Sequence, residues 1–210
     1  MLRALAYRLL RSVALWILER LPPGDPWDVT YTRAVPPQFF AAGSTRDFKQ
    51  YFTGLSGVHV ESLDDVCEWL FNCEFRTDLE LFHQADFWQH PLAFEQLRKG
   101  DCDDHALWGW RKLVELGMNA ELFSGMRLEQ DGSWAGHAWV LIKDGGHSTF
   151  LDSAVKVRSQ MIMPLATVQS KLRPHFAVGR DLSTRAYNGW LHTLVEGRRR
   201  ARARHRRAVA

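Results

Sequence analysis

The chain of 210 residues has few cysteines, no long apolar run and no internal repeat. Its three cysteines, Cys67, Cys73 and Cys102, form no Cys-x-x-Cys pair that would indicate zinc, and their odd number argues against a disulfide framework. We therefore expect a reducing compartment, the cytoplasm. The apolar stretch 13–18 is too short to span a bilayer, and no small-residue cleavage site follows it, which argues against a membrane span or a signal peptide there.

Composition points to one well-packed domain with appendages. Hydrophobic residues make up 46% of the chain and aromatic residues 12%, which is enough to bury a core. The formal net charge is +3, and seven arginines lie after residue 197, so the rest of the chain is acidic. An acidic body argues against the whole protein being a nucleic-acid binder.

We expect three parts along the chain. The sequence predicts an amphipathic N-terminal helix and a Pro-rich linker over residues 1–25. It predicts the main domain over residues 26–196 and an Arg-rich disordered tail over residues 197–210. The N-terminal helix either packs on its own domain or lies peripherally on a membrane surface or a partner. The tail is either solvated or contacts an anionic partner, lipid or nucleic acid. The sequence does not indicate an oligomeric state.

The segment Gly100-Asp101-Cys102 predicts the start of a helix. Gly100 breaks the preceding structure, Asp101 is a good N-cap, and apolar residues recur at helical spacing from 106 to 117. Cys102 would then lie in the first turn, where free N–H groups and the helix dipole lower a thiol pKa and can bind an oxyanion. The alternative is that Cys102 is a small buried core residue, as most cysteines are.

His137 and Asp152 lie on two strand-like runs joined by Lys143-Asp144-Gly145-Gly146. If Asp144 and Gly145 form the two-residue turn, His137 lies directly opposite Asp152, and the carboxylate can hold one imidazole nitrogen. A turn at Gly145 and Gly146 would instead place Trp139 opposite Asp152. We expect the first register.

Three carboxylates flank Cys102: Asp101, Asp103 and Asp104. Their charge would raise the thiol pKa by repulsion, so something should neutralise them. Ca²⁺ is one candidate, because it is a hard cation that takes carboxylate oxygens. The alternative is that Asp101 caps the helix while the other two are solvated or paired with nearby basic side chains. Those basic side chains are Arg98, Lys99 and Arg111.

Four segments together resemble the transglutaminase-like superfamily, and most of all its bacterial cysteine peptidases. They are Gly100-Asp101-Cys102-Asp103-Asp104, Phe87-Trp88-Gln89-His90-Pro91, Gly136-His137-Ala138-Trp139 and Leu151-Asp152. The resemblance covers about residues 45 to 155. It implies an α+β, papain-like fold in which a helix with the nucleophile Cys102 packs on an antiparallel sheet with the base His137 and its orienter Asp152. Calcium dependence is found in some of the similar peptidases.

The expected function is cysteine-dependent acyl transfer on amide bonds, by a peptidase or amidase that acts on a protein or peptide and requires no cofactor beyond the candidate Ca²⁺. The alternatives are a protein transglutaminase and a non-catalytic transglutaminase-like binding or assembly module. One oxyanion donor would be the Cys102 backbone N–H, and the second is Trp88, Gln89 or Gln96.

Three further segments are predicted to be helical. They are a helix near 44–55, a helix that begins at Ser62, and helical packing around the core over residues 155–195.

Overall fold

The computed structural model describes residues 13, 16–17, 20, 24–31 and 34–209. Most of the expected N-terminal helix, and residues 21–23 of the linker that follows it, lie outside these residues. The described strands are β1 (Val29–Tyr31), β2 (Glu74–Phe75), β3 (Lys99–Gly100), β4 (Ala120–Leu128), β5 (Trp134–Asp144), β6 (His147–Leu151), β7 (Ile162–Pro164), β8 (Leu172–Val178) and β9 (Thr184–Tyr187). The α-helices are α2 (Leu63–Phe71), α3 (Asp78–Phe82), α4 (Pro91–Leu97), α5 (Cys102–Glu115), α6 (Arg158–Met161), α7 (Leu165–Val168) and α8 (Gly189–Val209). The 3-10 helices are η1 (Pro37–Phe39), η2 (Phe48–Phe52) and η3 (Gln169–Lys171).

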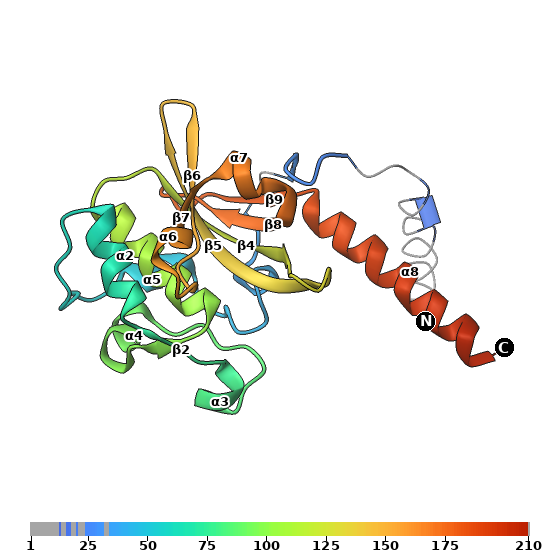
Figure 1. Ribbon diagram of the computed structural model, residues 1–210, viewed down its shortest axis with the longest axis horizontal. Helices are drawn as coiled ribbons and strands as arrows, with labels where there is room; N and C mark the ends of the chain where they lie inside the picture. The colour runs from blue at the N-terminus through green and yellow to red at the C-terminus, as the bar shows by residue number, and fades with distance from the viewer. Residues whose placement is uncertain (1–12, 14–15, 18–19, 21–23, 32–33, 210) are drawn as a thin grey trace.

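Within the described chain, seven strands form one antiparallel sheet in the order β1-β9-β8-β4-β5-β6-β7, and β2 pairs with β3 in a small parallel sheet. Helices α2, α4 and α5 gather on one side of the large sheet (Figure 1). The fold is therefore a mixed helix and sheet structure with a central antiparallel sheet, as expected.

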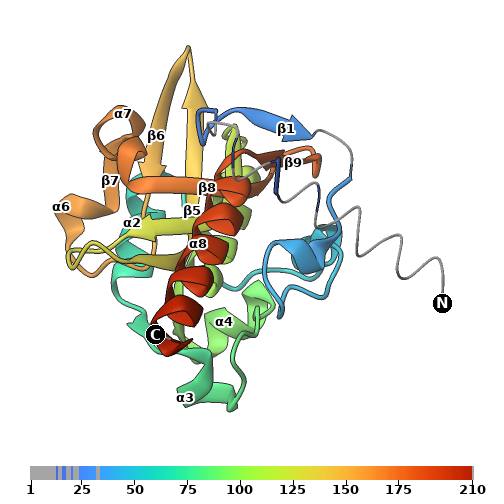
Figure 2. The ribbon, with the colours of Figure 1, turned by 90° about the vertical axis from the view of Figure 1, so that its right-hand side faces the viewer.

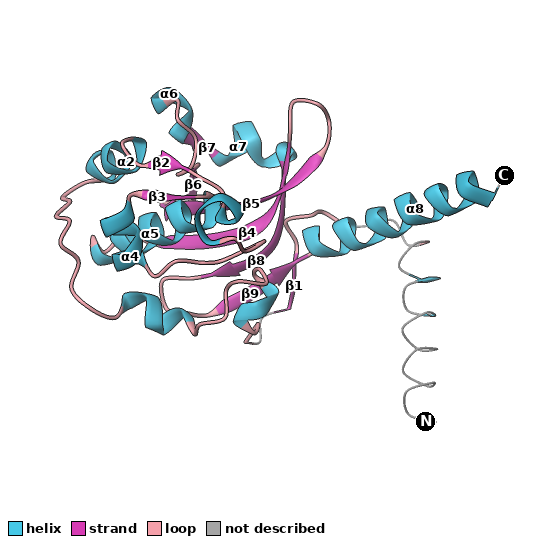
Figure 3. Ribbon diagram, turned by 90° about the horizontal axis from the view of Figure 1, so that it is seen from below, coloured by secondary structure: helices cyan, strands magenta, loops and turns pink. Residues whose placement is uncertain are grey.

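Helix α5 joins the helical layer to the sheet. Its Ala106, Trp110 and Leu113 are fully buried and belong to one hydrophobic cluster with Leu122 of β4 and Val140 of β5. Figure 3 shows α5 lying across these central strands. The first turn of α5 is thus fixed against β5, which carries His137.

A second cluster covers the opposite face of the sheet. Its buried members are Phe123, Trp139, Leu141, Phe150, Leu172, Ala177 and Tyr187. Trp27 and the side chains of α7 pack against them. Because both faces of the central strands are buried, those strands are held rigidly.

The β5–β6 hairpin has the second of the two registers considered, so the expected register is wrong. Asp144 pairs with His147 and Val140 with Leu151, which leaves Gly145 and Gly146 as the two-residue turn. Their φ angles are +50° and +88°. A type I′ turn requires positive φ at both central residues, and two glycines adopt it at less cost than Asp144 and Gly145.

Residues 155–195 are not mainly helical, which corrects the prediction for this segment. Strands β8 and β9 lie here and extend the sheet beyond β4. The residues near 44–55 form only the short helix η2, whereas the helix after Ser62 is present as α2 with Ser62 as its N-cap. Strand β8 alternates between buried and partly buried residues from Leu172 to Phe176, and its last three residues, up to Val178, are all buried.

Helix α8 includes the segment 197–210 up to Val209, where disorder was expected. It projects from the body in Figure 1 and crosses in front of the sheet in Figure 2. Arginine and alanine are strong helix formers, and the helix propagates from a first half anchored by buried Val195. Of the helices that the structure describes, none combines the length and apolar character needed to cross a bilayer.

Candidate functional site

A cavity of about 270 Å³ lies between the start of α5 and strands β4 and β5. It brings together Cys102, His137 and Trp88, which are three of the residues singled out from the sequence. The lining residues are Phe40, Ala41, Ala85, Asp86, Trp88, Asp101, Cys102, Asp103, Ser124, Gly125, Gly136, His137 and Ala138.

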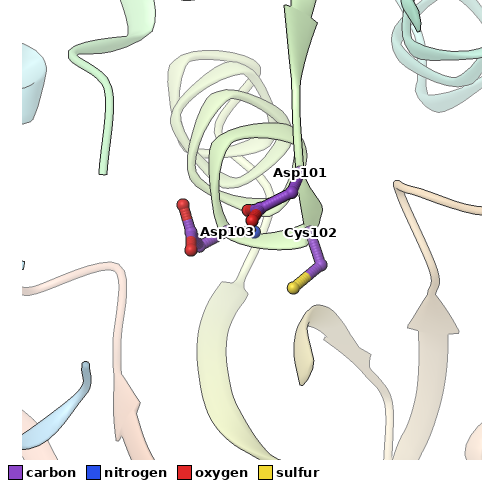
Figure 4. Close-up of side chains that lie close together, drawn as sticks. All are labelled: Asp101, Cys102 and Asp103. Carbon is purple, nitrogen blue, oxygen red and sulfur yellow. Dashed lines mark hydrogen bonds between the residues drawn. The ribbon is translucent and has the colours of Figure 1, made fainter. Parts of the chain in front are cut away.

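Cys102 occupies the first turn of α5, as predicted. The Asp101 carboxylate accepts a hydrogen bond from the Asp103 backbone N–H (3.4 Å), which makes Asp101 the N-cap. Figure 4 shows the Cys102 and Asp103 side chains diverging from this turn. Burial, and then the charges of Asp103 and Asp101, raise the pKa of the Cys102 thiol well above its ordinary value, although the Ala138 backbone N–H partly opposes this rise. The electrostatic conflict expected from the sequence is therefore present.

His137 and Asp152 lie close together despite the shifted register. His137 Nε2 is 3.2 Å from Asp152 Oδ2, and both side chains are almost fully buried. Asp152 follows the last residue of β6 and is displaced along the strand from the position opposite His137. The imidazole side chain is long enough to reach the carboxylate across this displacement. The imidazole also stacks on Trp139, with ring centroids 6.2 Å apart.

Arg127 of β4 is a member of this group that the sequence did not reveal. Its Nη1 donates to Asp152 Oδ2 (2.7 Å) and lies 3.5 Å from His137 Nε2. Burial opposes ionisation of Asp152, but the hydrogen bond and charge of His137 and the charge of Arg127 outweigh it, and the pKa of Asp152 is lowered. No local motif marks Arg127, because it reaches this site only through strand pairing.

Asp104 is buried rather than solvated. It accepts from the Gln89 backbone N–H (2.7 Å) and from Gln89 Nε2 (2.5 Å). Burial raises the pKa of Asp104 to about 8. Arg111, one of the expected partners, instead donates to the backbone carbonyls of 51, 53 and 54. The alternative of solvated or Arg-paired carboxylates is therefore wrong for Asp104.

Asp78 and Asp86 extend the acidic cluster, and sequence reasoning missed both. Oxygen atoms of Asp78, Asp86 and Asp103 lie within 4.8 Å of one another, as do those of Asp78, Asp101 and Asp104. Burial, followed by the charge of Asp101, raises the pKa of Asp78 to about 6. Asp78 begins the short helix α3, which lies at the opposite end of the molecule from the β5–β6 hairpin (Figures 1 and 2).

This cluster has the donor set that a hard cation requires. Asp78 Oδ1 and Asp103 Oδ1 are buried and have no hydrogen-bond partner among the described residues. Burial, then the charges of Asp104 and Asp101, raise the pKa of Asp103 well above its usual range. Oxygen atoms without partners, concentrated in one place, fit the ligands that Ca²⁺ takes in proteins. The residues that could hold it are Asp78, Asp86, Asp101, Asp103 and Asp104.

The three candidate donors to an oxyanion differ in whether they line the cavity and in whether their N–H groups already donate to another residue. Trp88 lines the cavity, and its Nε1 is buried without a hydrogen-bond partner in the described part of the chain. The Gln89 amide donates to the Lys99 carbonyl oxygen (2.9 Å) and to Asp104. Gln96 lies on α4, is exposed and is not among the cavity-lining residues.

Comparison with known proteins gives structural neighbours only. No protein-family model and no curated protein matches the sequence. LapG from Legionella pneumophila is similar in structure with a TM-score of 0.44 at 18% identity, over 65% of this chain and 72% of LapG. Its calcium-bound form gives the same TM-score and identity over 78% and 81%. A candidate cysteine protease from Cytophaga hutchinsonii gives 0.37 at 15% identity, over 66% and 39%. Similarity this low does not carry a residue's role from one chain to another.

Proposed function

We propose that the protein catalyses cysteine-dependent acyl transfer on amide bonds, as a peptidase or amidase of transglutaminase-like type with a protein or peptide substrate. The observation that carries this proposal is the shared cavity of Cys102 and His137, together with the 3.2 Å contact between His137 Nε2 and Asp152 Oδ2. A thiol, an imidazole and a carboxylate in this order match the roles of nucleophile, base and orienter.

The proposed reaction moves one proton at a time. His137 takes the proton from the Cys102 thiol, the sulfur bonds to the amide carbonyl carbon, and the C–N bond breaks as His137 gives that proton to the leaving amine. Water then attacks the thioester, His137 accepts the water proton, and the C–S bond breaks to release the acid and restore the thiol. Since Nε2 faces Asp152, we assign Nδ1 as the nitrogen that exchanges protons with Cys102.

Trp88 is our choice for the second oxyanion donor, beside the Cys102 backbone N–H. Its buried Nε1–H has no partner within the described residues, and a preorganised donor of this kind stabilises the developing negative charge. Gln89 is engaged elsewhere and Gln96 is remote from the cavity, which weighs against both.

We propose Ca²⁺ as the cation that Asp78, Asp86, Asp101 and Asp103 would hold. When bound, it would supply positive charge that offsets the carboxylates beside Cys102. A thiol that is freed from their repulsion loses its proton to His137 more readily. Asp104 would support the cluster through Gln89.

The test uses the purified full chain and a peptide library in Ca²⁺ or in chelator. New peptide termini should form with the wild type in Ca²⁺, and Cys102→Ala should abolish them. Ser124→Ala, a substitution elsewhere in the cavity wall, is the matched control and should retain the activity in part. Termini that form equally with Cys102→Ala would refute the proposal.

The same experiment separates the two alternatives. A transglutaminase would join peptides through isopeptide bonds to an added amine in place of new termini, because an amine rather than water resolves the thioester. A binding or assembly module would produce neither product in the folded wild type.

The Arg-rich end of α8 is proposed as the contact for an anionic partner, lipid or nucleic acid, in the cytoplasm or at the periphery of a membrane. Side chains 199–204 are exposed along the projecting helix. The three cysteines are free thiols, which is compatible with a reducing compartment. Binding of anionic vesicles and of DNA, each measured over a range of salt concentrations, tests this contact and separates the two partners.

A further inference from the structure

Residues 40–43 form one wall of the cavity that contains Cys102, and we call them the 40–43 wall. Phe40 and Ala41 line the cavity directly. The wall is joined to the sheet at its first residue, because the Ser124 hydroxyl of β4 donates to the Phe40 carbonyl oxygen. Residues 40–43 lie outside the helices and strands, so hydrogen bonds to other segments decide where the wall lies.

The other end of the wall is joined to the segment that carries Asp86. The Gly43 backbone N–H donates to Asp86 Oδ2. The two backbones approach closely here, since a Cβ atom at position 43 would lie 2.7 Å from the Phe87 Cα. Glycine is therefore the residue that fits without displacing either segment. A second link lies just beyond the wall, where Arg46 Nη1 donates to the Trp88 carbonyl oxygen (3.1 Å).

Asp86 also belongs to the acidic cluster beside Cys102. Oxygen atoms of Asp78, Asp86 and Asp103 lie within 4.8 Å of one another. A carboxylate has two oxygen atoms and several acceptor positions, so Asp86 can accept from Gly43 and contribute to a cation site at the same time. Ionised carboxylates this close repel one another, whereas a shared cation attracts them all. Ligation would thus hold Asp86 where Gly43 donates to it.

We propose that Asp86 is a positioning residue that joins the 40–43 wall to the cation site, so that ligation of Ca²⁺ by the acidic cluster fixes this wall of the cavity. The inference rests on the proposed binding of Ca²⁺ but not on acyl transfer. Phe40 and Ala41 would contact a substrate beside Cys102. A wall held in one position selects substrates by shape, so Asp86 would also affect specificity.

The test is amide-proton exchange by NMR in the full chain, without substrate, in saturating Ca²⁺ and in chelator at one pH. Ca²⁺ should slow exchange of the Gly43 amide about tenfold or more, because a held acceptor makes local opening rarer. Asp86→Asn retains an oxygen acceptor for Gly43 but loses the charge that attracts a cation. In this variant, the Ca²⁺ effect on Gly43 should fall below about threefold.

Gly43→Ala separates the wall from the cation site, because it leaves every carboxylate of the cluster in place. Calorimetry should show that this variant still binds Ca²⁺, while exchange of the Ala41 amide no longer responds to Ca²⁺. Gly57→Ala is the matched control, since a Cβ atom at position 57 meets nothing within 4 Å, and it should behave as the wild type. Melting curves show whether each variant is folded.

Three outcomes would count against these proposals in different ways. If the wild type binds Ca²⁺ and Gly43 exchanges equally fast in chelator, or if folded Asp86→Asn responds as the wild type does, the inference is wrong. A wild type that binds no Ca²⁺ would overturn the inference and the proposed cation together. A wall that Ca²⁺ protects, in a protein that forms no acyl-transfer product, would overturn only the proposed function.

Discussion

Raising the pH from 7 to 8 in chelator should lower the stability of this protein. Asp103 and Asp104 are buried, and burial raises the pKa of both, that of Asp104 to about 8. In the unfolded chain an aspartate titrates near pH ~3.9, so both are ionised there at pH 7. The folded state thus binds more protons than the unfolded state, and the free energy of unfolding falls as the pH rises.

The magnitude follows from proton linkage. Each carboxyl that is protonated in the folded state and ionised in the unfolded state removes about 1.4 kcal/mol of stability per pH unit. Asp104, whose pKa is raised to about 8, contributes a loss of about 1 kcal/mol between pH 7 and 8, and the raised pKa of Asp103 acts in the same direction. Unfolded histidine titrates near pH ~6.5 and unfolded cysteine near ~8.5, so buried His105 and the buried thiols add little in this window.

Urea unfolding followed by tryptophan fluorescence measures the effect at both pH values. Asp104→Asn should remove about 1 kcal/mol of this pH dependence, whereas Asp144→Asn, the same change at an exposed position of β5, should keep it. Saturating Ca²⁺ should flatten the dependence, because a bound cation favours ionised carboxylates. A free energy of unfolding that is constant or rises from pH 7 to 8 in chelator would refute this reasoning about the acidic cluster.

Three further outcomes are expected. Iodoacetamide should label Cys102 before Cys67 and Cys73, because Cys67 and Cys73 are buried in the core while Cys102 faces the cavity. Ca²⁺ should accelerate the labelling of Cys102. Equal labelling rates for all three cysteines would contradict the proposed site. Arg111→Met should lower the free energy of unfolding by about 2 kcal/mol in urea melts, since the buried Tyr51 carbonyl and the partly buried carbonyls of Thr53 and Gly54 lose their donor, and an unchanged value would count against that account. Deleting 197–210 should leave Cys102 labelling unchanged and weaken binding to anionic vesicles or DNA in a salt-dependent way; unfolding on deletion would show that this segment is structural.

Local sequence signals were sufficient where the structure depends on neighbours along the chain. Gly100 and Asp101 predicted the start of α5 and the place of Cys102 in its first turn, and both are confirmed. Helix caps depend on residues within one turn of each other, so they can be recognised in the sequence. The same holds for Ser62 at the start of α2.

The choice between two hairpin registers was decided by conformational energy, and the sequence favoured the register that does not occur. Asp144-Gly145 and Gly145-Gly146 both suit a hairpin turn, and the structure uses the second. His137 and Asp152 still meet, because a displacement along the strands is within reach of an imidazole. The closeness of His137 and Asp152 was therefore predicted from a register that does not occur.

The sequence by itself determined the capped helix with Cys102, the hairpin and the kinds of groups that the site would contain. Tertiary structure alone decided which residues surround these groups. Arg127 reaches Asp152 through strand pairing, and Asp78 and Asp86 reach Asp103 because the chain folds back over the start of α5. Burial then turns carboxylates that would be ordinary in water into groups with strongly raised pKa values, as at Asp103 and Asp104. Long-range contacts and desolvation leave no periodic trace along a chain, which is why these features appear only in the folded molecule.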